Sequence, residues 1–430
     1  MSRSRSLELF KFGVYLLVPI GLVGAIVYNP DNLDAVIRNR SYVVYPPEAP
    51  RPPTAEDFAE MEYQATIMVA TRSKKSACLV TGGSGFLGQH LVRQLADSGR
   101  YDVTVFDLRL PAAPLAGVTY VAGDLTDAAQ VAAACRGQQT VFHCATAAPT
   151  ASNSRNDALM RAVNIDGTRH VIDACVAGGV PRLVFTSSAS VVFEGRPLLG
   201  ADERAPYGAP PLDAYSTTKA EAERLALAAD GRGGLRALAL RPSGIFGEHD
   251  ALMVPSIVDN ARRGKLKYVI GDGRNLMDYT YAGNVAAAHI KADEALAAQE
   301  ADAAAPRVSG RAFFITNDEP RPFWGVTGDI CEGLGYPRPS VHLPAWLILA
   351  IAVFVVRVVV PLAALCGKTI QSDFTPARIR LATVSRTFSC EAAKRDLGYV
   401  PEVSMDEALR RTIKYFDHLK KPADAGKKAT

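Results

Sequence analysis

The strongest constraint on the fold is an alternation, beginning at Ala77, of short runs rich in β-branched residues with longer alanine-rich segments of helical periodicity. Strands that alternate with helices pair in parallel, because each crossover helix returns the chain to the same end of the sheet. The sequence therefore predicts an α/β fold with a doubly wound parallel sheet. The expected strands are Ala77–Thr81, Asp102–Asp107, Val118–Ala122, Thr140–Cys144, Arg182–Ser187 and Leu235–Leu240.

Composition limits the classes of function. Of the 430 residues, 48% are hydrophobic and 21% are charged, which is typical of a globular protein with some additional apolar segments. The 48 basic and 44 acidic residues give a net charge of +4, too small to indicate binding of nucleic acid through its phosphates. The seven cysteines are scattered and form no CxxC pair. We therefore predict no disulfide framework, no metal site and a catalytic part that faces a reducing compartment.

Two apolar segments indicate contact with a membrane. Phe12–Tyr28 follows three basic residues and is interpreted as an uncleaved anchor, with a cleaved or targeting sequence and a buried segment as alternatives. Leu343–Cys366 is long enough to span a bilayer. The charge of Arg357 inside it also allows a helix in the membrane interface or a buried helix that gates a pocket.

A glycine-rich turn follows the first expected strand and leads into a helix expected to open at Gln89. Glycines at GxxGxxG spacing let the backbone approach a pyrophosphate, whose charge is stabilised by free amides at a helix N-terminus. A strand before the turn and a helix after it favour a Rossmann-type dinucleotide site over a bland tight turn. The turn residues assigned to the cofactor are Gly82, Gly85, Phe86, Leu87 and Gly88.

Acidic residues end the next two strands. Asp107 lies about 20 residues after the last glycine, where a carboxylate accepts hydrogen bonds from the adenosine ribose. This favours NAD over NADP. The alternative is that Arg109 binds the 2′-phosphate of NADP. Asp124 and Leu125 follow the third strand in a place suited to the adenine, with a capping role as the alternative for Asp124.

A second motif supplies the chemistry. Tyr215 and Lys219 are four residues apart and so share one helical face. Both are also assigned to the cofactor, because a lysine there can hold the nicotinamide ribose. The pKa of a tyrosine is ordinarily near 10, and a nearby ammonium is expected to lower it and favour the phenolate as a base. Ser188, at the end of a strand, is expected to orient the substrate oxygen, with Ser187 as its competitor.

Four further stretches are far more specific than these motifs. With them, residues 77–420 resemble the 3β-hydroxysteroid dehydrogenase branch of the extended short-chain dehydrogenases, and within it the members that decarboxylate 4α-carboxysterols. The stretches are Thr186–Gly195, Leu240–Asp250, Val269–Tyr281, and Phe314–Pro320 with Phe323 and Trp324.

The resemblance implies site residues and a reaction. Asn164 would support the sheet or a proton relay, and Pro242 and Ser243 would lie beside the nicotinamide. The implied reaction is NAD-dependent oxidation of the 3β-hydroxyl of a sterol in sterol biosynthesis. The sterol would be a 4α-carboxysterol that then loses carbon dioxide. The implied catalytic set is Ser188, Tyr215 and Lys219.

Three other functions remain as alternatives. One is a 3β-hydroxysteroid dehydrogenase/isomerase, and the second is another extended dehydrogenase such as a nucleotide-sugar epimerase. Epimerases share the glycines, the serine and the YxxxK motif but have no need of a 24-residue apolar segment. The third is a membrane scaffold that senses NAD, which would have no need of Tyr215 paired with Lys219.

The first 65 or so residues lie outside this resemblance. Leu7–Tyr15 and Arg40–Glu48 resemble a small mitochondrial inner-membrane assembly factor for cytochrome c oxidase. The chain is therefore interpreted as a fusion or as two neighbouring reading frames joined. We expect the working enzyme to begin near Met68 and residues 1–67 to be dispensable for catalysis.

These interpretations define an expected organisation. The partners are a sterol substrate and membrane lipid, without nucleic acid, and a homodimer is left open. The expected location is the endoplasmic reticulum membrane with the catalytic domain facing the cytosol, or the mitochondrial inner membrane if the N-terminal segment is genuine. The expected domains are an apolar segment and proline-rich linker at 1–66, an NAD-binding domain at 76–335, a substrate lobe at 336–420 with a membrane helix at 343–366, and a disordered tail at 421–430.

Overall fold

The computed structural model of the chain describes residues 75–422, apart from 149, 151–152, 154–155, 303 and 366–374. Residues 74–430 belong to one compact unit. The predictions for residues 1–66, including the apolar segment, the proline-rich linker and the likeness to an assembly factor, lie outside the described residues, as does most of the expected tail. The border between an NAD-binding domain and a substrate lobe at residue 335 stays a prediction.

A seven-stranded, fully parallel sheet forms the centre of this unit, in the order β12-β7-β5-β4-β1-β2-β3. The strand order reverses at β1, which pairs with β2 on one side and β4 on the other. In open sheets of this kind ligands bind at the carboxyl ends of the strands beside such a reversal. The strands are β1 Ser76–Thr81, β2 Tyr101–Asp107, β3 Thr119–Ala122, β4 Thr140–His143, β5 Arg182–Thr186, β7 Arg236–Pro242 and β12 Ala312–Ile315.

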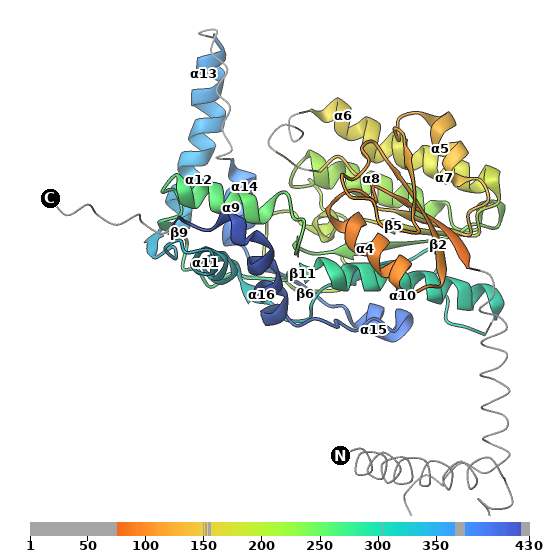
Figure 1. The fold of residues 1–430 in the computed structure, drawn as a ribbon. Coiled ribbons are helices and arrows are strands. Elements are labelled where there is room, and N and C mark those ends of the chain that lie inside the picture. Colours follow the sequence, from red (N-terminus) through yellow and green to blue (C-terminus); the bar gives the residue numbers. More distant parts are fainter. Residues whose placement is uncertain are drawn as a thin grey trace, which may run out of the picture. The chain divides into compact units, whose positions relative to one another are not determined.

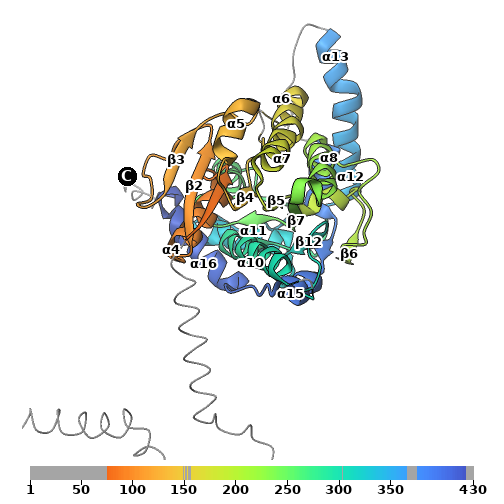
Figure 2. The same cartoon turned by 90° about the vertical axis from the view of Figure 1, so that its right-hand side faces the viewer.

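Helices cover both faces of the sheet (Figure 1). On one face α7 packs between α5 and α8, and on the other α10 packs against α4 and α15. The view along the sheet shows the strands lying between these two layers (Figure 2). The bounds are α4 Phe86–Asp97, α5 Ala128–Cys135, α6 Asp157–Arg161, α7 Gly167–Gly178, α8 Ala214–Ala228, α10 Ala282–Ala301 and α15 Glu391–Leu397, with a π-helical turn, Ala162–Asp166, joining α6 to α7.

The remaining elements form a smaller region beside the sheet. A four-stranded sheet has the order β13-β10-β15-β6, and two strand pairs join β11 to β8 and β14 to β9. The strands are β6 Leu198–Ala201, β8 Ile245–Phe246, β9 Tyr268–Ile270, β10 Leu276–Met277, β11 Thr280–Tyr281, β13 Arg321–Pro322, β14 Val341–Leu343 and β15 Arg386–Phe388. The helices are α9 Met253–Arg262, α11 Phe323–Gly333, α12 Ala345–Phe354, α13 Val360–Leu365, α14 Pro376–Thr383 and α16 Met405–Tyr415.

The α/β prediction and all six expected strands are confirmed, with ends that shift by one or two residues. Two details differ. The helix after the glycine-rich turn begins at Phe86 rather than Gln89, because Gly85 has extended backbone angles and serves as the N-cap. The seventh strand, β12, was not predicted as a strand, although its last residues lie in a stretch that carried the family resemblance.

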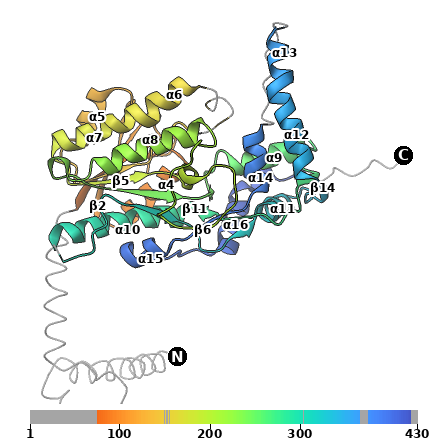
Figure 3. The same cartoon turned by 180° about the vertical axis from the view of Figure 1, so that it is seen from behind.

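The second apolar segment forms one continuous helical rod, α12 and α13 joined by the π-helical turn Val355–Val359. It projects from the rest of the unit, with α14 beside its base (Figure 3). Only 6% of its apolar window, Ala345–Ala363, is buried, and the mean hydropathy of that window is 2.6. The alternative of a buried gating helix is therefore wrong, because almost none of this apolar surface packs against the protein.

Candidate active site

The glycine-rich turn brings the backbone of β1 close to the start of α4. Gly82 has a φ of +72°, and a Cβ there would lie 2.6 Å from the Cα of Ala145. A Cβ on Gly88 would collide with the carbonyl oxygen of Gly82. Gly83, which the sequence analysis did not single out, is also required, because its Cβ would lie 2.8 Å from the methyl carbons of Val105. Glycine is therefore required at all three positions by packing as well as by any ligand.

The turn also fits the phosphates of a dinucleotide. The first amides of α4, including those of Phe86 and Leu87, have no acceptor within the helix and carry its positive dipole end. The hydroxyl oxygen of Ser84 is buried and makes no hydrogen bond to any described residue. Gly85, next to it, is exposed. A phosphate held over this turn would meet free amides and an unused hydroxyl.

Asp107 ends β2 directly beside the turn. One carboxylate oxygen accepts a hydrogen bond of 3.0 Å from the amide of Ser84, and the other accepts one of 3.2 Å from the amide of Arg109. Arg109 itself is exposed. The carboxylate of Asp107 therefore lies next to the turn, where a group that binds the adenosine ribose must lie. Part of its hydrogen-bonding capacity, however, is taken up by backbone amides.

Asp124, Leu125 and Ser243 have structural contacts of their own. A carboxylate oxygen of Asp124 accepts a hydrogen bond of 2.9 Å from the amide of Thr126 in the turn before α5, whereas the helix itself is capped by Asp127. Leu125 is buried in the core. Pro242 ends β7, and the hydroxyl of Ser243 donates to the carbonyl of Asp278 at 2.9 Å. Roles of these four residues in cofactor binding stay predictions.

Tyr215 lies in the first turn of α8, which the side chain of Asp213 caps by accepting a hydrogen bond of 2.7 Å from the amide of Ser216. Burial raises the pKa of Tyr215 to about 12, and the charge of Asp213 acts in the same direction. A hydrogen bond with Ser188 lowers the pKa but does not offset the burial. The spacing predicted a lowered pKa for the phenol, and this direction is wrong because burial and the charge of Asp213 both raise the pKa of Tyr215.

Lys219 is buried one turn further along α8. Its ammonium donates to the carbonyl of Thr186 at 2.5 Å and lies 4.3 Å from the centre of the Phe185 ring. Burial lowers the pKa of Lys219 to about 8. At neutral pH the side chain thus stays mostly protonated, while its charge is lost at a pH only slightly higher.

Ser188 is placed better than its competitor. Ser188 is partly exposed, and its hydroxyl lies 2.9 Å from the hydroxyl of Ser190. Ser187 is buried, and its hydroxyl makes no hydrogen bond to a described residue. Since Ser188 also contacts Tyr215, it is the serine that can meet a substrate oxygen together with the phenol.

Asn164 links the sheet to the catalytic helix. It lies in the π-helical turn, a feature that is frequent at functional sites. Its amide oxygen accepts hydrogen bonds from the amide of Ala147 and the hydroxyl of Thr146, after β4. Its amide nitrogen donates to the hydroxyl of Thr218, between Tyr215 and Lys219, at 3.0 Å. These contacts join the segment after β4 to α8, and both roles expected of Asn164, support of the sheet and a proton relay, stay predictions.

His143 is a buried residue of the site that the sequence analysis missed. Its ring nitrogens bond the hydroxyls of Thr81 at 2.7 Å and Thr168 at 3.0 Å. Burial, with the charge of Lys219, lowers its pKa to about 3, so the ring is neutral. The available signal was a polar residue ending an otherwise apolar strand, the same signal that identified Asp107.

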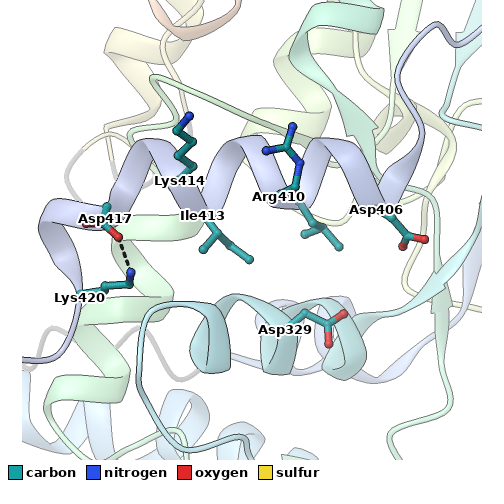
Figure 4. A pocket seen from close by; sticks show the side chains of 8 residues that line it. Asp329, Asp406, Arg410, Ile413, Lys414, Asp417 and Lys420 are labelled. Atoms are coloured by element: carbon teal, nitrogen blue, oxygen red, sulfur yellow. Dashed lines mark ion pairs between the residues drawn. The ribbon is translucent and has the colours of Figure 1, made fainter.

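One surface hollow lies away from these residues. It has a volume of about 580 Å³ and opens between α11 and α16 (Figure 4). Charged side chains dominate its walls, and none of the candidate catalytic residues lines it. An apolar substrate is therefore not assigned to it. Its lining residues are Asp329, Asp406, Leu409, Arg410, Ile413, Lys414, Asp417 and Lys420.

Comparison with known proteins identifies the family of the chain. Residues 79–345 match the model of the 3-beta hydroxysteroid dehydrogenase/isomerase family. The chain belongs to this family. It is 44% identical over 350 residues to the sterol-4-alpha-carboxylate 3-dehydrogenase, decarboxylating, of Mus musculus, which covers 81% of this chain and 93% of the mouse protein. It is 45% identical over 359 residues to 3beta-hydroxysteroid-dehydrogenase/decarboxylase isoform 1 of Arabidopsis thaliana, covering 80% of each chain.

Solved structures share the fold of this family member. The UDP-glucose 4-epimerase of Thermus thermophilus in complex with NAD has a TM-score of 0.59 at 23% identity, and covers 79% of this chain and 98% of its own. A dTDP-glucose 4,6-dehydratase of Streptomyces venezuelae with bound NAD has a TM-score of 0.60 at 23% identity, covering 80% and 97%. At these identities the likeness concerns the fold alone.

If the phenol of Tyr215 is the acid–base group, as predicted, Tyr215→Phe should reduce kcat by about 10² to 10⁴-fold while NAD still binds. With the Tyr215 pKa at about 12, the ionised fraction of the parent enzyme grows as pH rises from 6 to 8. Its oxidation rate should therefore rise over this range and level off above pH 8, where Lys219 loses its charge. Steady-state kinetics against pH measure both effects. Tyr268→Phe, on exposed β9, is the control, and turnover of the Tyr215 variant within threefold of the parent would contradict the role.

Asp107→Ser should raise kcat/KM for NADP relative to NAD by at least about tenfold, about 1.4 kcal/mol, because a carboxylate beside the turn repels a 2′-phosphate. Asp102→Ser is the matched control, since Asp102 is exposed at the opposite end of β2. Steady-state kinetics with NAD and with NADP measure the ratio of the two kcat/KM values. A parent enzyme that already prefers NADP would instead identify Arg109 as the residue that binds the 2′-phosphate.

Proposed function

We propose that this family member is an NAD-dependent dehydrogenase that oxidises the 3β-hydroxyl of a 4α-carboxysterol and releases carbon dioxide, within sterol biosynthesis. The observation that carries the proposal is the grouping of Ser188, Tyr215 and Lys219 at the carboxyl ends of the strands beside a dinucleotide turn. The identity of 40–45% to decarboxylating enzymes of two mammals and a plant, over most of their length, supports the choice of substrate.

The residues of this chain then have distinct tasks. NAD, when bound, would supply the hydride acceptor for C3. Ser188 holds the 3β-oxygen, and Tyr215 takes its proton as the C3–H electron pair departs, leaving a 3-ketone. The buried charge of Lys219 favours the phenolate form of Tyr215, and Thr186 holds that ammonium in place.

Decarboxylation needs no further base. The product of oxidation is a β-keto acid, in which the electron pair of the C4–carboxyl bond passes into an enolate when carbon dioxide leaves. Tyr215, which now carries the proton, and Ser188 both donate to the enolate oxygen and stabilise its charge. The same two hydroxyls therefore serve both steps.

The proposal extends to location. The exposed apolar rod α12–α13 places the enzyme at a membrane in which sterols dissolve, with membrane lipid as a partner. The cysteines among the described residues are all free thiols, which suits a cytosolic face of the endoplasmic reticulum. The nucleotide-sugar epimerase alternative gives no reason for this rod, and a scaffold that only senses NAD gives none for the buried Lys219.

The test is to incubate the detergent-solubilised full chain with NAD and a 4α-carboxy-3β-hydroxysterol and to follow NADH and carbon dioxide together. The two should appear in equal amounts. A 4α-methyl sterol without the carboxylate is the matched control and should yield NADH alone. The form beginning at Met68 should have the same activity per mole of folded protein if residues 1–67 are dispensable.

Two outcomes would contradict the proposal. NADH without carbon dioxide from the carboxysterol, together with an isomerised enone from an ordinary 3β-hydroxysteroid, would assign the dehydrogenase/isomerase reaction. Conversion of a UDP-sugar epimer without any NADH from a sterol would assign the epimerase reaction.

A further inference from the structure

The length of the apolar rod does not by itself decide whether the rod crosses a membrane. Large side chains face outward along the rod, including Trp346 at 71% exposure, Phe354 at 57% and Leu362 at 56%, whereas the side that carries Ile348, Ala352 and Val355 is half-buried or buried. The window Ala345–Ala363 corresponds to about 28 Å of helix at 1.5 Å per residue, close to the thickness of a bilayer core. By length, the helix could cross a membrane.

The strands on either side of the rod belong to the same folded unit. Before it, β14 pairs in parallel with β9, from Val341 beside Tyr268 to Leu343 beside Ile270. After it, α14 packs beside α12, and β15 pairs with both β6 and β10. The side chain of Trp324, on α11, also donates to the carbonyl of Ala382 at 3.1 Å. The chain therefore leaves the fold and returns to it on one side of any membrane.

The return path is too short and too polar to cross the bilayer a second time. Residues 366–374 connect the rod to Thr375, and nine residues reach about 31 Å only when fully extended. An extended backbone in hydrocarbon leaves its amide and carbonyl groups without partners, each costing several kcal/mol. Lys368 and Asp373 would also have to pass through the core. An upright, crossing helix is therefore incompatible with this fold.

We infer that the rod is a one-sided anchor that lies within a single leaflet, roughly parallel to the membrane surface, with the catalytic unit on the same side. This rests on the membrane association proposed above. Arg357, in the middle of the rod, then needs to reach only the headgroups, as long basic side chains do. At the foot of the rod, a hollow is lined by the polar side chains of Asp272, Arg274 and His342.

Lipid accounts for the exposed surface better than a second copy of the chain does. Packing against another copy would cover one stripe of the rod and would leave the opposite side in water. The window is apolar around its whole circumference, with a mean hydropathy of 2.6, and Arg357 is its single charged residue. A leaflet can cover the exposed sides of such a helix at once, and the side next to α14 is the one that lipid does not need to cover.

The chain has two tryptophans, which makes the depth of the rod measurable. Trp324→Phe leaves Trp346 as the reporter near the foot of the rod. Adding Trp346→Phe with either Phe354→Trp or Leu362→Trp moves the reporter to the middle or the far end. Each full-length variant is bound to phosphatidylcholine vesicles that carry bromine at shallow, intermediate or deep acyl positions, and tryptophan quenching is recorded.

All three reporters should be quenched most by the shallow bromines and should give similar depths. Strongest quenching of the Phe354→Trp reporter by deep bromines, with the two end reporters shallow, would indicate a crossing helix and overturn the inference. Trp346→Phe alone leaves the partly buried Trp324 as the control that should stay largely unquenched.

An activity assay separates the outcome of the quenching test from the validity of the proposed reaction. NADH formation from detergent-dissolved sterol shows that each variant is folded and that the enzyme assignment holds whatever the quenching result. Active variants without quenching by any lipid, together with dimers in gel filtration that Phe354→Asp dissolves, would show that a second copy covers the rod and would overturn the one-sided anchor.

Discussion

A buried chain of hydrogen bonds joins the cofactor turn to the catalytic helix, and the geometry of the site depends on it. The hydroxyl of Thr81, the last residue of β1, bonds His143, which bonds Thr168, whose hydroxyl donates to the carbonyl of Asn164 at 2.6 Å. The amide of Asn164 then donates to Thr218 on α8. Because the Asn164 carbonyl can only accept, Thr168 accepts from Nε2–H of His143, and Thr81 donates to Nδ1. Every proton in the chain is thus assigned, with the imidazole neutral.

A second constraint fixes α8 from its other side. Glu223, one turn beyond Lys219, is fully buried and pairs with Arg241 of β7 at 2.6 Å. Removing one member of such a pair leaves an unpaired buried charge, so the contact specifies where the helix lies against the sheet. Between these two attachments, the ammonium of Lys219 and the phenol of Tyr215 are held at the edge where β1, β4 and β5 end. Burial, which secures this geometry, also raises the pKa of the phenol, and the hydrogen bond with Ser188 acts against that effect.

The sequence predicted the parts of this structure that depend on local pattern. Strand periodicity, the glycine spacing and YxxxK each report on a few neighbouring residues, and β1 to β5 and β7 follow them closely. Tertiary contacts decided the rest. β12 is recognisable only through its pairing with β7, and His143 matters only because Thr81 and Thr168 lie on either side of it. The pKa of Tyr215 was predicted in the wrong direction because spacing reveals a neighbouring charge but not the loss of water.

The central claim is that a hydride leaves C3 of a sterol within this site before carbon dioxide does. The most direct measurement uses a 4α-carboxysterol that carries deuterium at C3, with mass spectrometry of the reduced cofactor and of the released gas. The account predicts one deuterium in each NADH formed, equal amounts of carbon dioxide, and loss of both in Tyr215→Phe. Carbon dioxide released with the deuterium still on the sterol would contradict it.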